Sequence, residues 1–273
     1  MQMKGFLFTI LLSMLFLSVF MFAVFYSSNY GGDERNRGVE RISYVYDDIS
    51  SDIMFMLGTN SSVEKGGDSF KVAWVFSIPS EIQDPVAEFR EYVSFLNSSY
   101  SEKIGVKTTI LDDALINAPE IRADDLRLRY GGLKRWSALF YAPRCSSQNY
   151  SLVIYLNDSC KKKCSKSVDY KWVEEADGTP FFIKIVDADG DVAFGQDGKI
   201  KLGSWVSVEL KKGSFLVSTA EEPAACVSLV PSGESGAWVT MNVSASGSVS
   251  GIYVPLDIAI DGQRYEKITI EGI

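Results

Sequence analysis

Hydrophobic residues form one uninterrupted run near the start of the chain and follow regular periods everywhere else. Residues 6–26 contain no charged side chain and are dominated by Phe, Leu, Met, Val and Ile. At about 1.5 Å per residue, this segment spans roughly 30 Å as a helix, which matches the hydrocarbon core of a bilayer. The pattern predicts a short leader at 1–5, a transmembrane helix at 6–26 that lies in the lipid bilayer, and a linker at 27–34.

The apolar run favours a retained signal anchor over a cleaved signal peptide. It is longer than the apolar core of about 7 to 15 residues in a signal peptide, and no small-x-small pair follows it. Basic residues flank both ends, with Lys4 before the run and Arg35, Arg37 and Arg41 after it. The positive-inside rule alone therefore leaves the orientation open.

A second segment has the period of an amphipathic helix. Apolar side chains recur at spacings of three and four residues from Ile42 to Met56, and Gly58 follows them. We expect an amphipathic helix over residues 35–58. Its apolar stripe at 35–57 packs on the adjoining domain, contacts other subunits or lies on the bilayer surface, and the sequence leaves these alternatives open.

Residues 70–143 mix helical and alternating patterns and predict an α+β subdomain. A polar loop containing Asn60 and Gly66-Gly67 is expected before it. The expected elements are a strand at 70–76, a helix that starts at Asp84-Pro85, and strands near 104–110, 126–130 and 133–141, the last two joined across Gly131-Gly132.

Residues 144–273 show no helical period, and turn residues separate short apolar runs about every 8 to 12 positions. This spacing is typical of an antiparallel β-sandwich or barrel. Asp261-Gly262, between two alternating runs, is the strongest hairpin signal. The expected fold class is α+β to mainly β, with an antiparallel β-sandwich-like domain at 144–273.

The cysteines indicate an oxidising compartment. An even number of four residues, all located after the apolar run, predicts two disulfides, and the sequence does not separate the three pairings; they are Cys145, Cys160, Cys164 and Cys226. Buried free thiols and a zinc site are the alternatives. Zinc fits less well because only one cysteine pair is closely spaced and the chain contains no histidine.

Five of the eight asparagines begin an Asn-x-Ser triplet without proline, the acceptor pattern for N-glycosylation: Asn60, Asn97, Asn149, Asn157 and Asn242. This number exceeds what the serine and threonine content predicts by chance. An alternative explanation is that asparagine and serine cluster because both favour turns. Together with the cysteines, the triplets predict that the C-terminal domain is extracytoplasmic.

Composition excludes several kinds of chemistry. Without histidine, the chain has no Ser-His-Asp or Cys-His nucleophile system and no imidazole base. Its adjacent acidic pairs point to different faces of a helix or strand, so none forms a dyad with a shared proton. The net charge of −8 and the pI of about 4.8 argue against binding to nucleic acid. We assign no catalytic residue, metal ligand or cofactor.

Three groups of residues are candidates for binding. Asp187, Asp189 and Asp191 alternate as at the start of a calcium loop, but Gly198 occupies the position of the glutamate ligand, and a tight turn explains the same residues. Basic residues gather around one predicted hairpin, on a face that is solvated or meets an anionic glycan, a lipid head group or an acidic neighbour: Arg122, Arg127, Arg129, Lys134 and Arg135. Five tryptophans in predicted strands pack in the core or, where exposed, stack on sugars: Trp74, Trp136, Trp172, Trp205 and Trp238.

The first residues of the chain resemble a known leader. Lys4-Gly5 directly before Phe6-Leu7-Phe8 is similar to the junction of type IV pilins and of archaeal filament proteins with class III signal peptides. The resemblance covers residues 1–26. It implies cleavage after Gly5 and packing of the apolar helix at a filament's centre, with a β-rich head outside. The sequence departs from the family at Ile10, where bacterial pilins have glutamate, and at Gly31-Gly32, which interrupts a helix that is usually continuous.

We therefore expect a single-pass membrane protein with an exterior, disulfide-stapled and glycosylated β-rich domain in a structural, adhesive or binding role. The alternative is a pilin-like filament subunit processed after Gly5. A carboxylate-dependent surface hydrolase is the third hypothesis, and it requires two carboxyl groups that face each other across a cleft.

Overall fold

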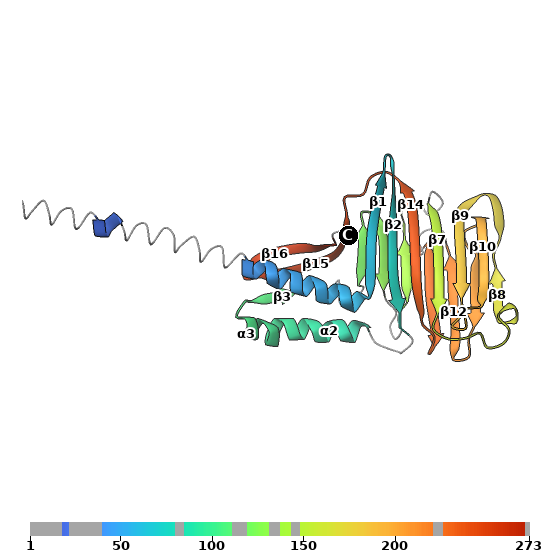
Figure 1. Ribbon diagram of the computed structural model, residues 1–273, viewed down its shortest axis with the longest axis horizontal. Coiled ribbons are helices and arrows are strands. Elements are labelled where there is room, and N and C mark those ends of the chain that lie inside the picture. The colour runs from blue at the N-terminus through green and yellow to red at the C-terminus, as the bar shows by residue number, and fades with distance from the viewer. Residues whose placement is uncertain are drawn as a thin grey trace, which may run out of the picture. The chain divides into compact units, whose positions relative to one another are not determined.

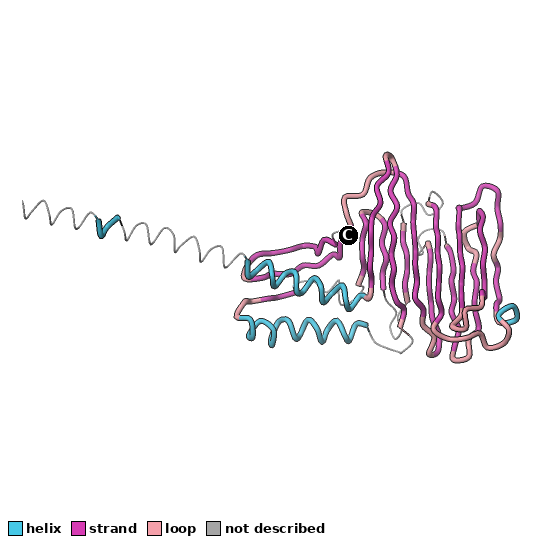
Figure 2. The backbone as a smooth tube through the Cα atoms, viewed as in Figure 1, coloured by secondary structure: helices cyan, strands magenta, loops and turns pink. Residues whose placement is uncertain are grey.

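The computed structural model of the chain is mostly β (Figures 1 and 2). The chain divides into two compact units, Met1–Ile49 and Ser50–Ile273. All strands belong to the second unit. The structure describes residues 18–21, 40–79, 85–110, 119–130, 137–142, 148–220 and 226–270.

Little of the predicted membrane segment falls within these residues. Of the predicted span at 6–26, residues 18–21 are described, and they are helical. Within the described ranges, no helix is both long enough and apolar enough to cross a membrane. The predicted leader at 1–5 and linker at 27–34 lie outside the described residues.

The predicted amphipathic helix is present at residues 40–57, and its first predicted residues lie outside the described part. Its buried side chains come at every fourth position, and they are Val45, Ile49, Ile53 and Leu57. Ile42, Tyr46 and Met56, three of the positions expected on the apolar stripe, are half-buried. The buried stripe is thus rotated relative to the predicted one.

The second unit contains two β-sheets. The six-stranded sheet has the order β1-β2-β14-β7-β9-β10. Among the described strands, β7 and β9 form the one parallel pair. The strands of this sheet are β1 (Thr59–Gly66), β2 (Ser69–Ile78), β7 (Asn149–Leu156), β9 (Glu174–Val186), β10 (Val192–Ile200) and β14 (Ala237–Ser246).

The ten-stranded sheet has the order β16-β15-β4-β5-β6-β13-β12-β11-β8, and β3 pairs with β15 beside this path. Both sheets therefore take strands from both predicted segments, 70–143 and 144–273. The strands of the larger sheet are β3 (Thr108–Ile110), β4 (Glu120–Ala123), β5 (Leu126–Tyr130), β6 (Ala138–Tyr141), β8 (Val168–Lys171), β11 (Trp205–Glu209), β12 (Gly213–Thr219), β13 (Val227–Gly233), β15 (Ile252–Ile260) and β16 (Gln263–Ile270).

Aromatic side chains join the inner faces of the two sheets into one core. Alternation along β2 turns every second side chain inward, and these side chains are at most 8% exposed. The ring of Trp74 on β2 lies 5.4 Å from that of Phe140 on β6, and Phe76 lies 5.8 Å from Tyr130 on β5. The predicted alternation at 70–76 is therefore confirmed, and Trp74 packs in the core.

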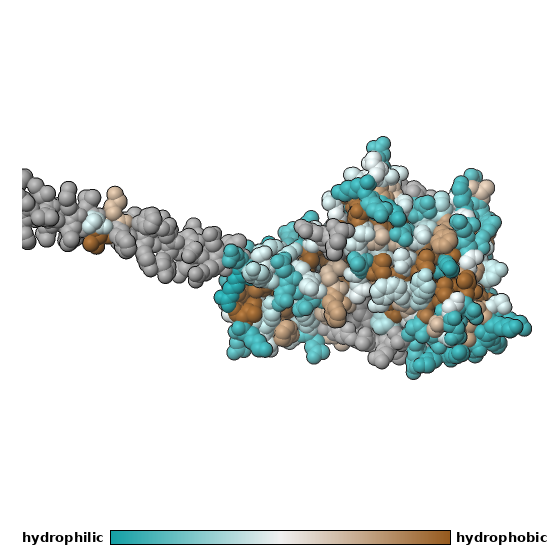
Figure 3. Space-filling view, viewed as in Figure 1, coloured by the Kyte–Doolittle hydropathy of each residue, from teal (hydrophilic) through white to brown (hydrophobic). Residues whose placement is uncertain are grey.

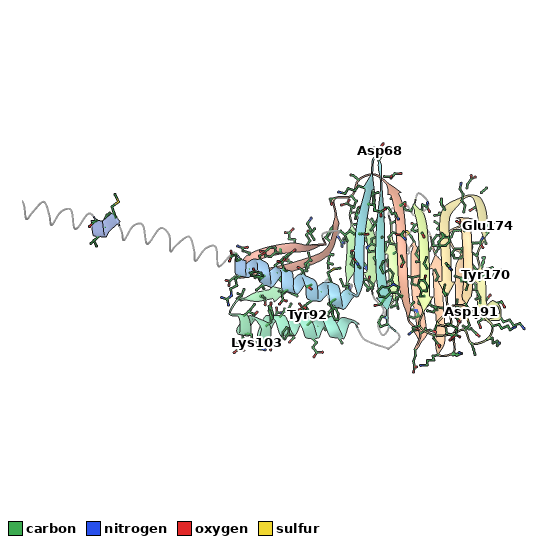
Figure 4. All side chains as sticks on the ribbon, viewed as in Figure 1. Asp68, Tyr92, Lys103, Tyr170, Glu174 and Asp191 are labelled. Atoms are coloured by element: carbon green, nitrogen blue, oxygen red, sulfur yellow. A yellow bond between two sulfur atoms is a disulfide. The ribbon has the colours of Figure 1, made fainter. Side chains whose placement is uncertain are left out.

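The helical segment after residue 85 begins at the predicted proline. It runs through α2 (Pro85–Phe95), the π-helical turn η1 (Leu96–Tyr100) and α3 (Ser101–Ile104). The Tyr92 hydroxyl, labelled in Figure 4, donates a hydrogen bond to the Asp52 carboxylate at 3.1 Å. The Thr108 hydroxyl donates to the Leu96 carbonyl at 2.8 Å and ties η1 to β3. The strand predicted near 104–110 is thus shorter than expected because the helix extends to Ile104.

One expected loop is a strand. β1 occupies the predicted polar loop and pairs with β2 from Thr59 opposite Phe76 to Gly66 opposite Ser69. An edge strand with a polar sequence shows no hydrophobic alternation, so the pattern fails to predict it. The predicted Asp261-Gly262 hairpin is confirmed: both residues have positive φ, 51° and 86°, as a type I′ turn between β15 and β16 requires. The Gly131-Gly132 hairpin lies outside the described residues.

Candidate functional site

A disulfide closes the loop that leads from β7 in one sheet to β8 in the other. Of the pairings that the sequence leaves open, the structure contains the one between Cys160 and Cys164, with Cα atoms 5.3 Å apart. Cys226 is also disulfide-bonded, and Cys145 lies outside the described residues.

The carboxylate of Asp187 organises the turn between β9 and β10. It is 5% exposed and accepts hydrogen bonds from the backbone amides of Cys160, Asp189 and Asp191 at 3.0, 3.1 and 2.9 Å. The ligand atoms of Cys160, Cys164 and Asp187 lie within 4.8 Å of one another. Sulfurs that are bonded to each other offer no thiolate to a metal, so the group acts as a structural staple for a tight turn.

Arginine side chains gather on the outer face of the ten-stranded sheet. Leu126 and Leu128 of β5 are at most 3% exposed, and the alternating Arg127 and Arg129 are half-buried on the opposite face, as predicted. The register places Arg127 between Arg122 of β4 and Tyr141 of β6. We call Glu120, Arg122, Arg127, Arg129 and Tyr141 the arginine cluster.

Glu120 is the one carboxylate of the arginine cluster, and its side chain is 5% exposed. The Arg122 guanidinium forms an ion pair with it and donates from Nε at 2.5 Å, while Arg129 donates from Nη2 at 3.1 Å. The guanidinium of Arg129 also lies 5.3 Å from the centre of the Tyr141 ring. Two guanidinium groups thus share one carboxylate, and both are fixed in place.

Arg127 completes the cluster in a different way. Among the residues that the structure describes, no carboxylate pairs with its guanidinium. Three arginines and one glutamate leave a local excess of positive charge on a chain whose net charge is −8. A guanidinium with free donors, held beside two positioned neighbours, is suited to a carboxylate, sulfate or phosphate group. Lys134 and Arg135 lie outside the described residues.

Three of the five Asn-x-Ser asparagines share the outer face of the six-stranded sheet. Asn60 of β1 lies opposite Val75 of β2, and both point away from the core. On β14, Asn242 alternates with the buried Met241 and Val243, and on β7, Asn149 precedes the buried Tyr150. Residues of β14 pair with β2 on one side and β7 on the other, so these asparagines lie on one continuous surface.

The other two asparagines each bind a backbone amide through their side chain. Oδ1 of Asn157 accepts a hydrogen bond from Gly236 N at 2.7 Å, and Oδ1 of Asn97 accepts from Ile110 N at 3.2 Å. Only the oxygen of the amide accepts a hydrogen bond, so this bond fixes which side-chain atom is engaged. Nδ2, the atom to which an N-linked glycan attaches, remains available in both residues.

The tryptophans divide between core and surface. Trp74 is fully buried, whereas Trp238 is 51% exposed on the outer face of the six-stranded sheet. Trp172 and Trp205 are half-buried, and Trp172 contacts Phe181 and Phe194 with ring centres 5.5 and 5.6 Å apart. Trp136 lies outside the described residues. In Figure 3, hydrophilic residues cover the tip of β1 and β2, the loops at the lower right and much of the helical part, and hydrophobic residues, in brown, lie between them over the strands.

Sequence reasoning missed two members of the arginine cluster. Glu120 and Tyr141 reach the cluster through the pairing of β4, β5 and β6, which is a long-range feature. A local signal existed for Glu120, because Glu120 and Arg122 are two residues apart and share a face when the segment is a strand.

The chain matches no known protein family, no curated protein and no solved structure.

Proposed function

We propose that this chain is a single-pass membrane protein whose β-sandwich is extracytoplasmic, glycosylated on one face and engaged in binding an anionic partner through the arginine cluster. The apolar run at 6–26 is the anchor. This role belongs to the structural, adhesive or binding class rather than to an enzyme class.

The single observation that carries the exterior location is the placement of the Asn-x-Ser asparagines. Asn60, Asn149 and Asn242 point outward from one sheet, and Asn97 and Asn157 keep Nδ2 available. A glycan at each of these five positions is compatible with an intact core because none of the side chains points into it. The Cys160–Cys164 disulfide adds support, since such bonds persist in oxidising compartments.

Protease treatment of intact cells tests the location. We expect added protease to remove the sandwich from cells that keep a cytosolic marker protein intact. A sandwich that resists protease until the cells are lysed would contradict the proposal. Mass spectrometry of the protein from its native membrane then shows which of the five asparagines carry a glycan.

The binding role rests on the difference between the available and the engaged guanidinium groups of the arginine cluster. Arg122 and Arg129 are held by Glu120, whereas Arg127 has donors free for a partner. The partner is an anionic group, because a guanidinium forms bidentate hydrogen bonds with carboxylate, sulfate or phosphate.

A second function is a pilin-like filament subunit, which Lys4-Gly5 before the apolar run favours. N-terminal sequencing of the protein from its native membrane separates the two. A mature chain that starts at Phe6 supports the filament subunit, and a chain that starts at Met1 supports the signal anchor.

A further inference from the structure

Two large aromatic side chains lie exposed next to each other on the six-stranded sheet. Tyr155 of β7 and Trp238 of β14 are direct partners in the register, and they are 49% and 51% exposed. Their neighbours Ile154 and Val239 are fully buried, so both rings lie on the outer face. A tyrosine and a tryptophan in this position present a flat, weakly polar surface to solvent.

Asn157 is the first residue after β7, the strand that carries Tyr155. Its backbone amide donates to the Gly236 carbonyl at 3.1 Å, and its Oδ1 accepts from Gly236 N at 2.7 Å. Asn157 and Gly236 thus extend the ladder by one pair beyond Leu156 and Ala237. Asn157 lies in the bend directly after β7 and is exposed, two residues beyond Tyr155. Two residues of extended chain advance at most about 6.8 Å, which places Asn157 about one sugar ring from Tyr155.

We propose that the first sugar of an N-linked glycan on Asn157 stacks on Tyr155 and Trp238, so that this glycan is a structural part of the sandwich. The proposal rests on the exterior location argued above. The hydrogen bond from Gly236 holds the side-chain amide in one orientation and leaves Nδ2 for the sugar. The C–H groups of a sugar ring carry small positive charges that suit the negative face of an aromatic ring.

Asn97 supplies an internal control with the same sequence spacing. Phe95 precedes Asn97 by two residues, as Tyr155 precedes Asn157, and Phe95 is 44% exposed. Phe95 is the last residue of α2, and Asn97 lies in the π-helical turn η1 that follows it. At about 100° per residue, the two side chains lie on nearly opposite sides of the helix axis. The Phe95 ring therefore points away from a glycan on Asn97 and packs beside Tyr100, at 5.8 Å.

Removal of the sequon serine tests the proposal without changing the asparagine. Ser159→Ala abolishes the Asn157 acceptor triplet and keeps the hydrogen bond between Asn157 and Gly236. Ser99→Ala abolishes the Asn97 triplet and keeps the hydrogen bond between Asn97 and Ile110. In protein from the native membrane, we expect Ser159→Ala to lower the melting temperature by about 2–4 °C, which is the effect of a lost contact in a chain of this size. Ser99→Ala is expected to shift it by less than about 1 °C.

A second substitution shows whether the aromatic rings mediate the effect. Trp238→Ala should lower the melting temperature of the glycosylated protein and have little further effect once Ser159→Ala has removed the glycan, because the two changes remove the same contact. Equal effects of Trp238→Ala in both backgrounds would overturn the stacking.

The outcomes separate the inference from the proposed function. A glycan on Asn157 whose loss leaves the melting temperature unchanged overturns the inference alone. A bare Asn157 in a protein that carries glycans at other positions also overturns the inference alone. Five bare asparagines overturn both the inference and the proposed glycosylated domain.

Discussion

The outer surface of β2, β7 and β14 differs from that of β4 and β5, although the inner faces of the two sheets are alike. In β2, β7 and β14, the outward positions are Ser, Thr, Ala, Val, Asn, Tyr and Trp with a single charge at Lys71. In β4 and β5, the outward positions are a glutamate and three arginines. No described strand of the ten-stranded sheet contains an asparagine.

The inner positions of the strands build the fold, and the outer positions distinguish the surfaces. Both inner faces follow the same two-residue period of apolar side chains, so both sheets contribute buried side chains to the core. The outward positions are free of that requirement. The surface of β2, β7 and β14 is therefore uncharged apart from Lys71, whereas that of β4 and β5 has fixed positive charge.

The largest effect is expected from the inner side of the six-stranded sheet. Trp74→Ala should lower the free energy of unfolding by about 3–5 kcal/mol because it empties a fully buried site. Trp238→Ala, on the outer side of the same sheet, should cost less than about 1 kcal/mol in the unglycosylated protein. Urea unfolding measures both, and equal losses would contradict the assignment of the two sides.

The second-largest effect is expected at alkaline pH, which should lower the free energy of unfolding through two tyrosines of the shared core. Burial raises the pKa of Tyr130 and of Tyr150 well above the ordinary value of about 10. The folded state keeps both phenols neutral, and the unfolded state ionises them above about pH 10. The contribution of the neutral phenols to stability is therefore complete below about pH 10. Above that pH the free energy of unfolding falls by up to about 1.4 kcal/mol per pH unit for each tyrosine.

Urea unfolding between pH 9 and 11 measures this slope. Tyr130→Phe removes one of the two phenols, along with its hydrogen bond to the Thr59 hydroxyl. It should reduce the slope of the unfolding free energy against pH by the amount that corresponds to about one proton released on unfolding. A slope that is the same in Tyr130→Phe and in the unsubstituted protein would show that Tyr130 ionises equally in both states.

On the charged face, Glu120→Gln should destabilise the protein by about 1–2 kcal/mol. The substitution leaves Arg122 and Arg129 without their shared charge, and the loss is moderate because both guanidinium groups keep contact with water. Glu234→Gln is the matched control. Its pair with Lys212 is exposed on both sides, so its loss should change stability by less than about 0.5 kcal/mol in the same unfolding assay.

The smallest change in stability is expected at Arg127, where the effect should appear in binding. Arg127→Ala should leave the free energy of unfolding within about 0.5 kcal/mol and weaken the binding of polygalacturonate or dextran sulfate about tenfold. Lys171→Ala removes the same charge from β8, at the far edge of the sheet, and should change binding less than about twofold. Equal losses would show that charge alone, and not the cluster, binds the polyanion.

Local patterns predicted much of the fold. Alternation at β2 and β5 gave the buried side of each strand, Asp84-Pro85 marked the start of α2, and Asp261-Gly262 marked the last hairpin. Each depends on neighbours in sequence: side-chain period, proline geometry or positive φ. The polar edge strand β1 lacked such a signal.

The candidate sites were predictable only in part. Alternation placed Arg127 and Arg129 on one side of β5, but the partner Glu120 required the pairing of β4 with β5. The shared face of Asn60, Asn149 and Asn242 depends on the order β1-β2-β14-β7. Strand order comes from long-range pairing, which a pattern along the chain does not contain.

The pairing of β2 with β14 has a consequence for how the protein is made. Ser69–Ile78 leaves the ribosome well before Ala237–Ser246, and at about 5–20 residues per second the delay is roughly 10 to 30 s. During that interval the central edge of β2 has no neighbour. The serine of the Asn157 triplet, which is 9% exposed in the finished fold, leaves the ribosome about 80 residues before β14, which corresponds to roughly 4 to 16 s. The topology thus sets a kinetic window in which a modifying enzyme would reach the proposed acceptor triplet before folding closes it.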